Sequence, residues 1–420
     1  MALEFDILDP FDESAENLSR LRGWADATGR AFHQARLTDE GFGVWLAASR
    51  GFEPRIRGAW VPAGEFGAGP VPAATFISFA GELNTGAELL PLHMISDVSV
   101  SPSHRRQGLL RRMMTEDLDH AVAEGRPLAA LTVTEGSIYG RFGFGPATWR
   151  AQVEVDVSAR FALPGVQPYG RIAMVAPDTM GTLPRDLFAA WHRRSRGSLS
   201  RPPHYDIVTR KSWDWQEQAP DRKLRGAVHL DDAGVPDGFV LYRHQGWDRP
   251  RTVQVEDLVA VSPAAELALW RFLAEMDLTD VLKASAPVED PLTWALADPR
   301  SRRVTEVGDH IWLRVLDVPR ALEARPWYGD GEVVLEVDDP MGHAAGRWRV
   351  AARDGAATVT PTDDPVGVHT DASTLSSLYL GGVRTRTLAD AGRLRGEPEQ
   401  LTSLASIADG GPAPFSRTSF

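Results

Sequence analysis

The sequence Val-x-Val-Ser-Pro occurs twice in this chain, at residues 98–102 and again at residues 259–263. Each copy ends a predicted strand, and the Ser-Pro pair breaks the strand at that point. Apolar residues at helical spacing follow each copy, over 109–124 and 264–276, and a further short strand follows each helix. Strand–helix–strand order is typical of a parallel unit, so its repetition predicts a duplicated α/β domain.

The length of the chain indicates how many domains to expect. A single hydrophobic core rarely grows beyond about 250–300 residues, so 420 residues predict more than one domain. From about residue 315 onward, short predicted strands come first and helices follow, which is typical of an α+β domain. We therefore expect three domains, at residues 1–150, 151–314 and 315–420.

The composition excludes several classes of function. The chain has no cysteine, which excludes disulfide scaffolds, cysteine-ligated metal sites and thiol catalysis. Its 57 acidic and 45 basic side chains give a formal charge of −12, which argues against a nucleic-acid partner. The eleven histidines show no metal-binding spacing, and no apolar stretch of about 18 residues occurs. We therefore expect no metal, no membrane partner and a cytoplasmic location.

The most informative single motif lies between residues 98 and 111. The strand that ends in Val98, Ser99 and Val100 leads into a turn with two arginines and Gly108, and the turn opens the predicted helix. The first N–H groups of a helix have no internal partner and lie at the positive end of its dipole, so such a turn can bind a pyrophosphate. The residues alone leave a second interpretation open, namely an ordinary helix start with solvated arginines.

A second motif follows at the end of the next predicted strand. That strand ends at Thr134 and Glu135, a short helix then holds Tyr139, and a Gly-Phe-Gly turn follows at residues 143–145. A phenol within hydrogen-bond reach of a leaving sulfur can protonate it. The alternative is a half-buried tyrosine whose hydroxyl is satisfied elsewhere, and the residues alone do not separate the two.

Together these motifs resemble the GNAT superfamily of N-acetyltransferases. Within it, the chain is similar to the Eis family (enhanced intracellular survival) of actinobacteria, through His-Arg-Arg-x-Gly-Leu-Leu-Arg at 104–111 and Glu-Gly-x-Ile-Tyr-Gly-Arg-Phe-Gly at 135–143. Residues 311–325 resemble the stretch that leads into the last domain of that family, and residues 376–382 resemble a segment inside that domain. The chain also ends in phenylalanine, as members of the family do.

The resemblance implies an α/β fold, α+β overall, with tandem GNAT domains followed by a C-terminal domain like sterol carrier protein. The first GNAT domain would be active and the central one degenerate, because the second copy lacks the basic glycine turn. The last domain would deliver the C-terminal carboxylate. The resemblance also implies a homo-oligomer, which is a hexamer in that family.

The resemblance further implies acetyl-CoA as co-substrate and assigns residues to its binding. In the superfamily, the strand equivalent to residues 98–100 leaves its neighbour, and its backbone pairs with the acetyl-pantetheine arm. Thr134 and Glu135 would also touch that arm. Backbone N–H groups of the turn and the helix start would bind the pyrophosphate, namely those of Arg106, Gln107, Gly108, Leu109, Leu110 and Arg111.

Two catalytic groups follow from the resemblance. Tyr139 would be the general acid that protonates the departing thiolate. The C-terminal carboxylate of Phe420 would be the base that deprotonates the amine, directly or through water. A free α-carboxyl has a pKa of about 3.5 and is a poor base unless it is buried or relayed. The alternative for Phe420 is a frayed terminus, but the apolar approach at residues 412–415 favours a tail that docks.

The predicted reaction is direct transfer of an acetyl group from acetyl-CoA to a primary amine. The amine would belong to a cationic small molecule or protein, of the aminoglycoside, polyamine or lysine type. Family members that accept aminoglycosides carry a carboxylate just before the C-terminus, whereas this chain ends in Arg417-Thr418-Ser419-Phe420 without one. The alternative function is a non-catalytic protein that binds acyl-CoA or lipid in a vestigial acetyltransferase site.

Overall fold

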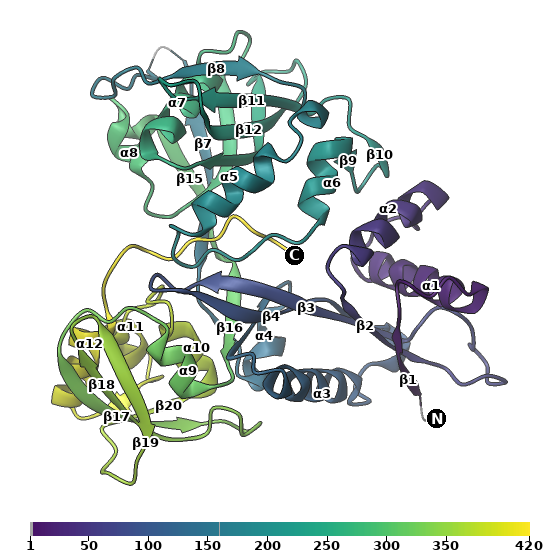
Figure 1. Cartoon of the computed structure of the whole chain (residues 1–420), viewed down its shortest axis with the longest axis vertical. Coiled ribbons are helices and arrows are strands. Elements are labelled where there is room, and N and C mark those ends of the chain that lie inside the picture. Colours follow the sequence, from purple (N-terminus) through teal and green to yellow (C-terminus); the bar gives the residue numbers. More distant parts are fainter. Residues whose placement is uncertain (1–2, 159) are drawn as a thin grey trace.

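The computed structural model describes residues 3–158 and 160–420, which form three main sheets with helices packed against them (Figure 1). Two of these sheets have seven strands each, and the third has five. In Figure 1 the first sheet lies at the lower right, the second at the top and the third at the lower left. The C-terminal tail, drawn in yellow, ends between the first two.

The first sheet contains the predicted strand–helix–strand unit. Helix α3 (Leu109–Ala123) joins β4 (Leu89–Val100) to β5 (Leu128–Thr132), and these two strands form the parallel pair of the sheet. The helix predicted over 109–124 and the short strand predicted after it are therefore confirmed. The sheet order is β1-β2-β3-β4-β5-β16-β6, with the other strands at β1 (Glu4–Leu8), β2 (Arg55–Trp60), β3 (Ala74–Asn84), β6 (Gly145–Pro146) and β16 (Ile311–Val315).

Helices cover both faces of the first sheet (Figure 1). The apolar side chains of α3 recur at helical spacing and are buried in one cluster with residues of the sheet, such as Phe76 and Ile95. Burying a side chain of this kind contributes roughly 1.5–3 kcal/mol, so the cluster fixes α3 on the sheet. The opposite face is covered by α1 (Ala15–Ala31) and α2 (Asp39–Arg50).

The second sheet repeats the first. Its order is β8-β11-β12-β13-β14-β7-β15, and its parallel pair, β13 and β14, is joined by α7 (Pro263–Ala274). The parallel pair is the fourth and fifth strand in both orders, so the predicted duplication is confirmed. The strands are β7 (Trp149–Asp156), β8 (Arg171–Met174), β11 (Arg225–Leu230), β12 (Pro236–His244), β13 (Thr252–Ala260), β14 (Val281–Ala286) and β15 (Arg302–Asp309). In addition to α7, this part of the chain contains the helices α5 (Leu183–His192), α6 (His204–Lys211) and α8 (Pro291–Ala295).

The sixth strand of each sheet comes from a part of the chain that adjoins the other sheet in the sequence. β16 lies between β5 and β6 in the first sheet, although it follows every strand of the second sheet in the sequence. β7 follows directly after β6 but pairs with β14 and β15. The expected domain boundaries at 150/151 and 314/315 therefore both fall inside strands. The periodicity of apolar residues predicts that a segment is a strand, but it does not predict which sheet the strand joins.

The third sheet has the order β19-β18-β17-β20-β21. One hydrophobic cluster runs from the first sheet into this domain, since Leu92 and Leu313 are buried together with Leu375 and Leu380. The strands are β17 (Gly331–Asp338), β18 (Gly346–Arg353), β19 (Ala356–Pro361), β20 (Val368–Asp371) and β21 (Arg395–Gly396). The helices are α9 (Val318–Glu323), α10 (Ala372–Leu378), α11 (Thr385–Asp390) and α12 (Pro398–Ala408).

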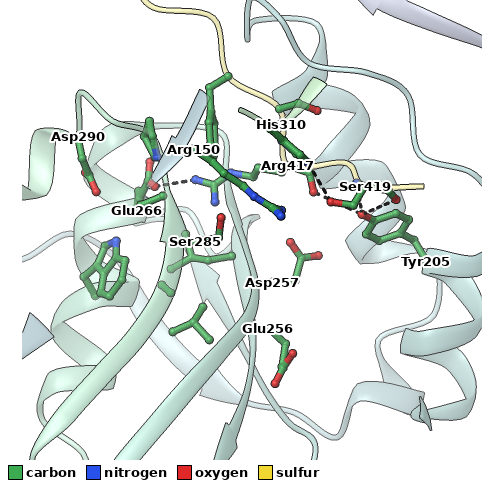
Figure 2. A pocket seen from close by; sticks show the side chains of 18 residues that line it. Arg150, Tyr205, Glu256, Asp257, Glu266, Ser285, Asp290, His310, Arg417 and Ser419 are labelled. Atoms are coloured by element: carbon green, nitrogen blue, oxygen red, sulfur yellow. Dashed lines mark hydrogen bonds and ion pairs between the residues drawn. The ribbon is translucent and has the colours of Figure 1, made fainter. Parts of the chain in front are cut away.

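After α12 the chain leaves the third domain and runs back between the two seven-stranded sheets (Figure 1). Residues 415–417 and 419 line a cavity of about 170 Å³ at the second sheet. Figure 2 shows Arg417 and Ser419 of this tail close to Tyr205 and His310.

Two features are absent from the described part of the chain. Among the helices within 3–158 and 160–420, none combines the length and the apolar character needed to span a membrane. Within the same ranges, no three His, Asp or Glu side chains are grouped so that they could hold a metal ion.

Candidate active site

The two parallel strands of the first sheet separate beside the motif at residues 98–111. β4 pairs with β5 only over Leu92–Ile95, and beyond that point its ladder partner is β3 alone. A β-bulge interrupts the β3–β4 ladder here, and Asp97 has a left-handed φ of 50°. Because a bulge bends its strand, β4 turns away from β5. The residues on the edge of β4 that β5 leaves free include Val98, Ser99 and Val100.

The turn after β4 presents the N-terminus of α3. Gly108 directly precedes the helix with a φ of 78°, and Arg106 also has a positive φ, of 63°. No side chain of the described residues caps this helix, and a methyl group on Gly108 would meet no described atom within 4 Å. The first N–H groups of α3 are therefore approachable, which fits the binding of a pyrophosphate.

The predicted pyrophosphate-binding residues divide into two groups by exposure. Leu109 is buried and Leu110 is half-buried against the core of the sheet, so they anchor the first turn of α3. The exposed members of the set are Arg106, Gln107, Gly108 and Arg111. The turn therefore combines a fixed helix end with guanidinium groups in solvent, an arrangement that attracts anions.

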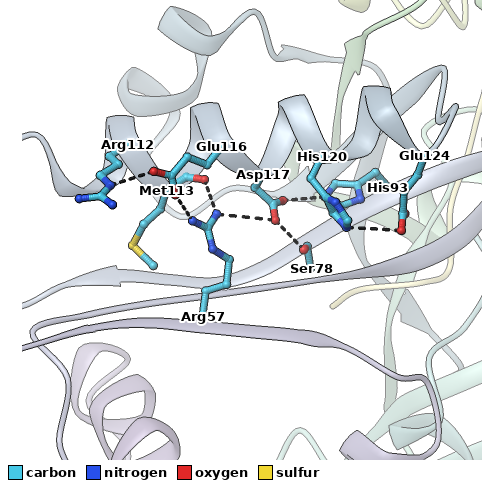
Figure 3. A network of polar contacts seen from close by, with 9 residues as sticks. All are labelled: Arg57, Ser78, His93, Arg112, Met113, Glu116, Asp117, His120 and Glu124. Carbon is cyan, nitrogen blue, oxygen red and sulfur yellow. Dashed lines mark hydrogen bonds and ion pairs between the residues drawn. The ribbon is translucent and has the colours of Figure 1, made fainter. Parts of the chain in front are cut away.

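A buried polar network holds α3 against the sheet (Figure 3). The carboxylate of Asp117, on α3, accepts a hydrogen bond of 2.8 Å from Ser78 Oγ and lies 2.6 Å from His93 Nε2. Arg57 Nη1 lies 3.9 Å from the same carboxylate, and Nη2 donates to Glu116. The network connects β2, β3 and β4 to the middle of α3. Sequence reasoning missed it because its members come from four separate elements.

Tyr139 lies at the end of the short helix α4 (Gly136–Tyr139), which follows β5. Its side chain is buried, and its ring packs edge-on against Phe144 with centroids 6.3 Å apart. Burial raises the pKa of Tyr139 above its ordinary value of 10, and the carboxylate of Glu135 raises it further. The phenol is therefore protonated at neutral pH, as a proton donor must be. Thr134 and Glu135 are exposed in the loop between β5 and α4.

The turn after Tyr139 is fixed from the third domain. Gly143 has a φ of 80°, and a side chain at this position would collide with the guanidinium of Arg314. Arg314, on β16, forms a buried ion pair with Asp339 at the end of β17. Ser376 of α10 also donates a hydrogen bond of 3.1 Å to the Gly143 carbonyl. Strand β16 and the last domain thus both support the segment that carries Tyr139.

The C-terminus reaches the end of β5. Thr132 Oγ1 donates a hydrogen bond of 2.7 Å to the terminal carboxyl group of Phe420. The ring of Phe420 packs edge-on against Phe79, with centroids 5.8 Å apart, and it contacts the cluster that contains Phe52. The tail is therefore docked, and the strand end that holds its carboxyl group leads through residues 133–138 to Tyr139. Sequence reasoning missed Thr132, because nothing local marks a strand residue as the partner of a distant terminus.

Asp97 adds an ionisable group at the bulge of β4. Burial raises the pKa of its carboxyl group from the ordinary 3.8 to about 6. No described residue forms an ion pair with this carboxylate, so no opposite charge offsets the cost of burial. The charge of Asp97 therefore works against the folded state at neutral pH.

Comparisons with known protein families follow the same order along the chain. Residues 17–147 match a family of acetyltransferase (GNAT) domains, and residues 206–315 match a second family of acetyltransferase (GNAT) domains. Residues 318–417 match the sterol carrier protein domain family.

Similar proteins cover most of the chain. An uncharacterized N-acetyltransferase of Streptomyces avermitilis is 37% identical over 353 residues, which are 80% of this chain and 82% of that protein. N-acetyltransferase Eis of Mycobacterium tuberculosis is 36% identical over 340 residues, which are 78% of this chain and 80% of that protein. The crystal structure of Eis1 from Mycobacterium abscessus has a TM-score of 0.80 at 28% identity and covers 99% of this chain and 100% of its own.

Proposed function

This chain belongs to the Eis family of GNAT N-acetyltransferases, and from that premise we propose that it acetylates a primary amine of a cationic substrate with acetyl-CoA. The acetyl group moves directly from the thioester to the amine. The absence of cysteine agrees with this, because no cysteine-linked acyl-enzyme can form.

The docked C-terminus is the observation that carries the proposal. Chain ends usually fray, whereas the Phe420 carboxyl group accepts a hydrogen bond of 2.7 Å from Thr132. The same strand end leads into the segment of Tyr139. A fixed carboxylate at the end of β5 and a protonated phenol in the segment that follows this strand support their use as base and acid.

In the proposed step, the amine nitrogen attacks the thioester carbonyl carbon. A C–N bond forms and the C–S bond breaks. The amine proton passes to the Phe420 carboxylate, directly or through water, and the leaving sulfur takes its proton from Tyr139. The raised pKa of Tyr139 supports this assignment, because the phenol keeps its proton until the thiolate develops.

Acetyl-CoA supplies the activated acetyl group, and we assign its binding to the place where β4 and β5 of the first sheet separate. The free edge of β4 at residues 98–100 would pair with the pantetheine arm, and Thr134 and Glu135 would flank it. The N–H groups of residues 106–111 would bind the pyrophosphate. The uncapped helix end and the open space at Gly108 support this assignment.

A cytoplasmic location and a hexameric assembly extend the same proposal. Light scattering on the purified protein tests the assembly, and a mass of six chains is the expected result. A monomer in solution would contradict it.

A thiol-release assay tests the reaction. Acetyl-CoA is supplied with an aminoglycoside, a polyamine or a lysine peptide, and its binding is followed in parallel by a thermal-shift titration. We expect CoA release with at least one amine together with a rise in Tm. A rise in Tm without CoA release on any amine supports the alternative function, a non-catalytic acyl-CoA-binding protein.

A chain with one glycine appended after Phe420 tests the base. The addition moves the carboxylate away from Thr132 and leaves an amide at Phe420. We expect kcat to fall by about a hundredfold, the usual scale for loss of a general base, while the Kd of acetyl-CoA stays constant. Undiminished turnover removes Phe420 from the mechanism.

A further inference from the structure

The parallel strands of the second sheet separate as those of the first do, and here a cavity lies at the point of separation. β13 pairs with β14 only over Thr252–Gln254, and beyond that point it continues to Ala260 beside β12. A β-bulge interrupts the β12–β13 ladder near the point of separation. Residues of both strands line one cavity together with residues 415–417 and 419 of the tail. The central domain therefore receives the C-terminal segment where the superfamily fold forms its cofactor cleft.

The central domain binds the tail at the residue directly before Phe420. Tyr205, on α6, accepts a hydrogen bond of 2.8 Å from the Ser419 N–H, and its hydroxyl lies 3.3 Å from the Ser419 carbonyl oxygen. His310 Nε2 lies 2.9 Å from Ser419 Oγ, as Figure 2 shows. Both the backbone and the side chain of Ser419 are therefore held, and the carboxylate that follows has little freedom.

The tail is also held further upstream. Arg417 forms an ion pair of 2.8 Å with Glu266 on α7, and Thr418 Oγ1 donates a hydrogen bond of 2.8 Å to the Leu199 carbonyl. Ser416 and Thr418 are buried, whereas Arg417 between them is half-buried. Burial therefore alternates along residues 416–419, as side chains do in an extended segment, and residues 415–417 and 419 line the cavity.

Two of the charged groups near the tail are paired with opposite charges. Arg201 and Asp257 form a bidentate pair with two contacts of 2.8 Å, and Arg417 is neutralised by Glu266. His310 is buried, and burial together with Arg150 lowers its pKa to about 3, so the ring that faces Ser419 is neutral. Neutral hydrogen-bonding groups thus face Ser419, which suits a peptide backbone.

We propose that the cleft of the central domain is a binding site for the chain's own C-terminal peptide, and that Tyr205 and His310 position the Phe420 carboxylate by holding Ser419. The inference rests on the proposed function, because positioning this carboxylate affects turnover only if Phe420 is the base. Tyr205 and His310 are positioning residues, since they contact Ser419 and act through it. The degenerate domain then contributes to the reaction of the first domain by holding the C-terminal tail in place, and we call the contacts of Tyr205 and His310 with Ser419 the clamp.

The kinetic test uses the full-length chain with Tyr205→Phe, which removes the hydroxyl that holds Ser419. Tyr242→Phe is the matched control, because Tyr242 is a buried tyrosine of the same domain that packs in the core of the second sheet against Phe272. We expect kcat to fall about tenfold in Tyr205→Phe, the scale of losing one or two hydrogen bonds, with unchanged KM for acetyl-CoA. Equal kcat in the two variants overturns the positioning role. His310→Ala repeats the test at the side chain of Ser419, so the outcome does not depend on one variant folding.

Hydrogen–deuterium exchange measures the clamp without reference to turnover. The amides of residues 415–420 should exchange faster in Tyr205→Phe than in the wild type or in Tyr242→Phe. Unchanged exchange at these residues overturns the clamp. If the glycine-extended chain keeps full turnover, Phe420 is not the base. Hydrogen–deuterium exchange still tests whether the central domain binds the tail, because it does not depend on turnover.

A double-variant comparison tests whether Tyr205 acts through the carboxylate. If the glycine extension lowers turnover, Tyr205→Phe should cause no further loss in the extended chain, because both changes displace the same group. Multiplicative losses would show that Tyr205 acts by another route and would overturn its positioning role.

Discussion

The two GNAT domains have sheets of the same topology but differ in what they offer a ligand where their parallel strands separate. In both, the parallel pair separates after a short ladder, over Leu92–Ile95 in the first and Thr252–Gln254 in the second. In the first domain, α3 begins after Gly108 with no capping side chain among the described residues. In the central domain, Pro263 begins α7, and Ser262 Oγ accepts a hydrogen bond of 3.2 Å from Ala265.

The difference teaches that strand geometry and ligand binding are separable. The separation of the parallel strands is a property of the sheet, so duplication preserves it. Binding an anion needs unpaired N–H groups at the helix start as well, and the central helix satisfies part of this set with its own cap. Fold-level likeness alone would give both domains the same role, whereas their residues at the helix start differ.

The largest expected effect is on turnover, and it distinguishes Tyr139 of the first domain from Tyr242 of the central domain. Tyr139→Phe should lower kcat by about a hundredfold or more, because the leaving thiolate loses its proton donor. The Kd of acetyl-CoA, measured by calorimetry, should stay constant. Tyr242→Phe in the central domain should leave both quantities unchanged. Wild-type turnover in Tyr139→Phe would mean that the acid lies elsewhere.

The acidic residues near the two bulges give the next comparison. Glu256, at the central bulge, lies 3.3 Å from Arg243, whereas Asp97 has no ion-pair partner among the described residues. Because the folded state raises the pKa of Asp97 to about 6, this carboxyl group costs no stability below about pH 4 and increasingly destabilises the fold as the pH rises through 6. This increase in the pKa of Asp97 corresponds to a loss of about 3 kcal/mol of folding free energy at most.

Asp97→Asn should therefore raise Tm at pH 8 and have little effect at pH 4, which calorimetric melts at the two pH values check. Turnover should persist in the variant, since Phe420 is the proposed base. Lost turnover in a stabilised Asp97→Asn chain would move the base to Asp97 and would contradict the role of the tail.

Two glycines at opposite ends of α3 test the helix N-terminus. Gly108 and Gly125 have φ values of 78° and 70°, and a methyl group at either would meet no described atom within 4 Å. Substitution by alanine should strain both to a similar degree, by about 1–2 kcal/mol. Only Gly108→Ala should weaken acetyl-CoA binding, by about tenfold in Kd. Equal affinity in the two variants would argue against a pyrophosphate at this turn.

The smallest effect belongs to the cap of the central helix. Ser262→Ala removes the side chain that accepts from Ala265, which should cost about 1 kcal/mol of stability. Acetyl-CoA binding and kcat should remain at wild-type values, because the tail still lies in that cleft. A chemical-denaturation curve and a binding isotherm measure the two quantities. A gain of a second acetyl-CoA site would show that the cap alone kept this cleft closed.

Local patterns were sufficient to predict most elements inside each domain. The helices over 109–124 and 264–276 were both predictable, because apolar spacing is a property of neighbouring residues. The basic turn was recognisable for the same reason, since Gly108 and its arginines are contiguous. Tyr139 and Phe420 were different, because the residues alone left each of them with two interpretations until the family resemblance was added.

Contacts between distant segments could not be predicted from the sequence. No property of residues 311–315 marks them for the first sheet instead of the second. Thr132, Tyr205 and His310 bind the tail from three separate parts of the chain, and none of them carries a local signal of that contact. Asp117 and its partners likewise meet only after the sheet has formed.

The stoichiometry of acetyl-CoA binding tests most directly whether only the first of the two GNAT domains binds acetyl-CoA. Isothermal titration of acetyl-CoA into the full-length chain should give one site per chain, and Gly108→Ala should weaken that site. Two sites per chain would contradict the account, because they would mean that the central cleft also binds acetyl-CoA in place of the tail.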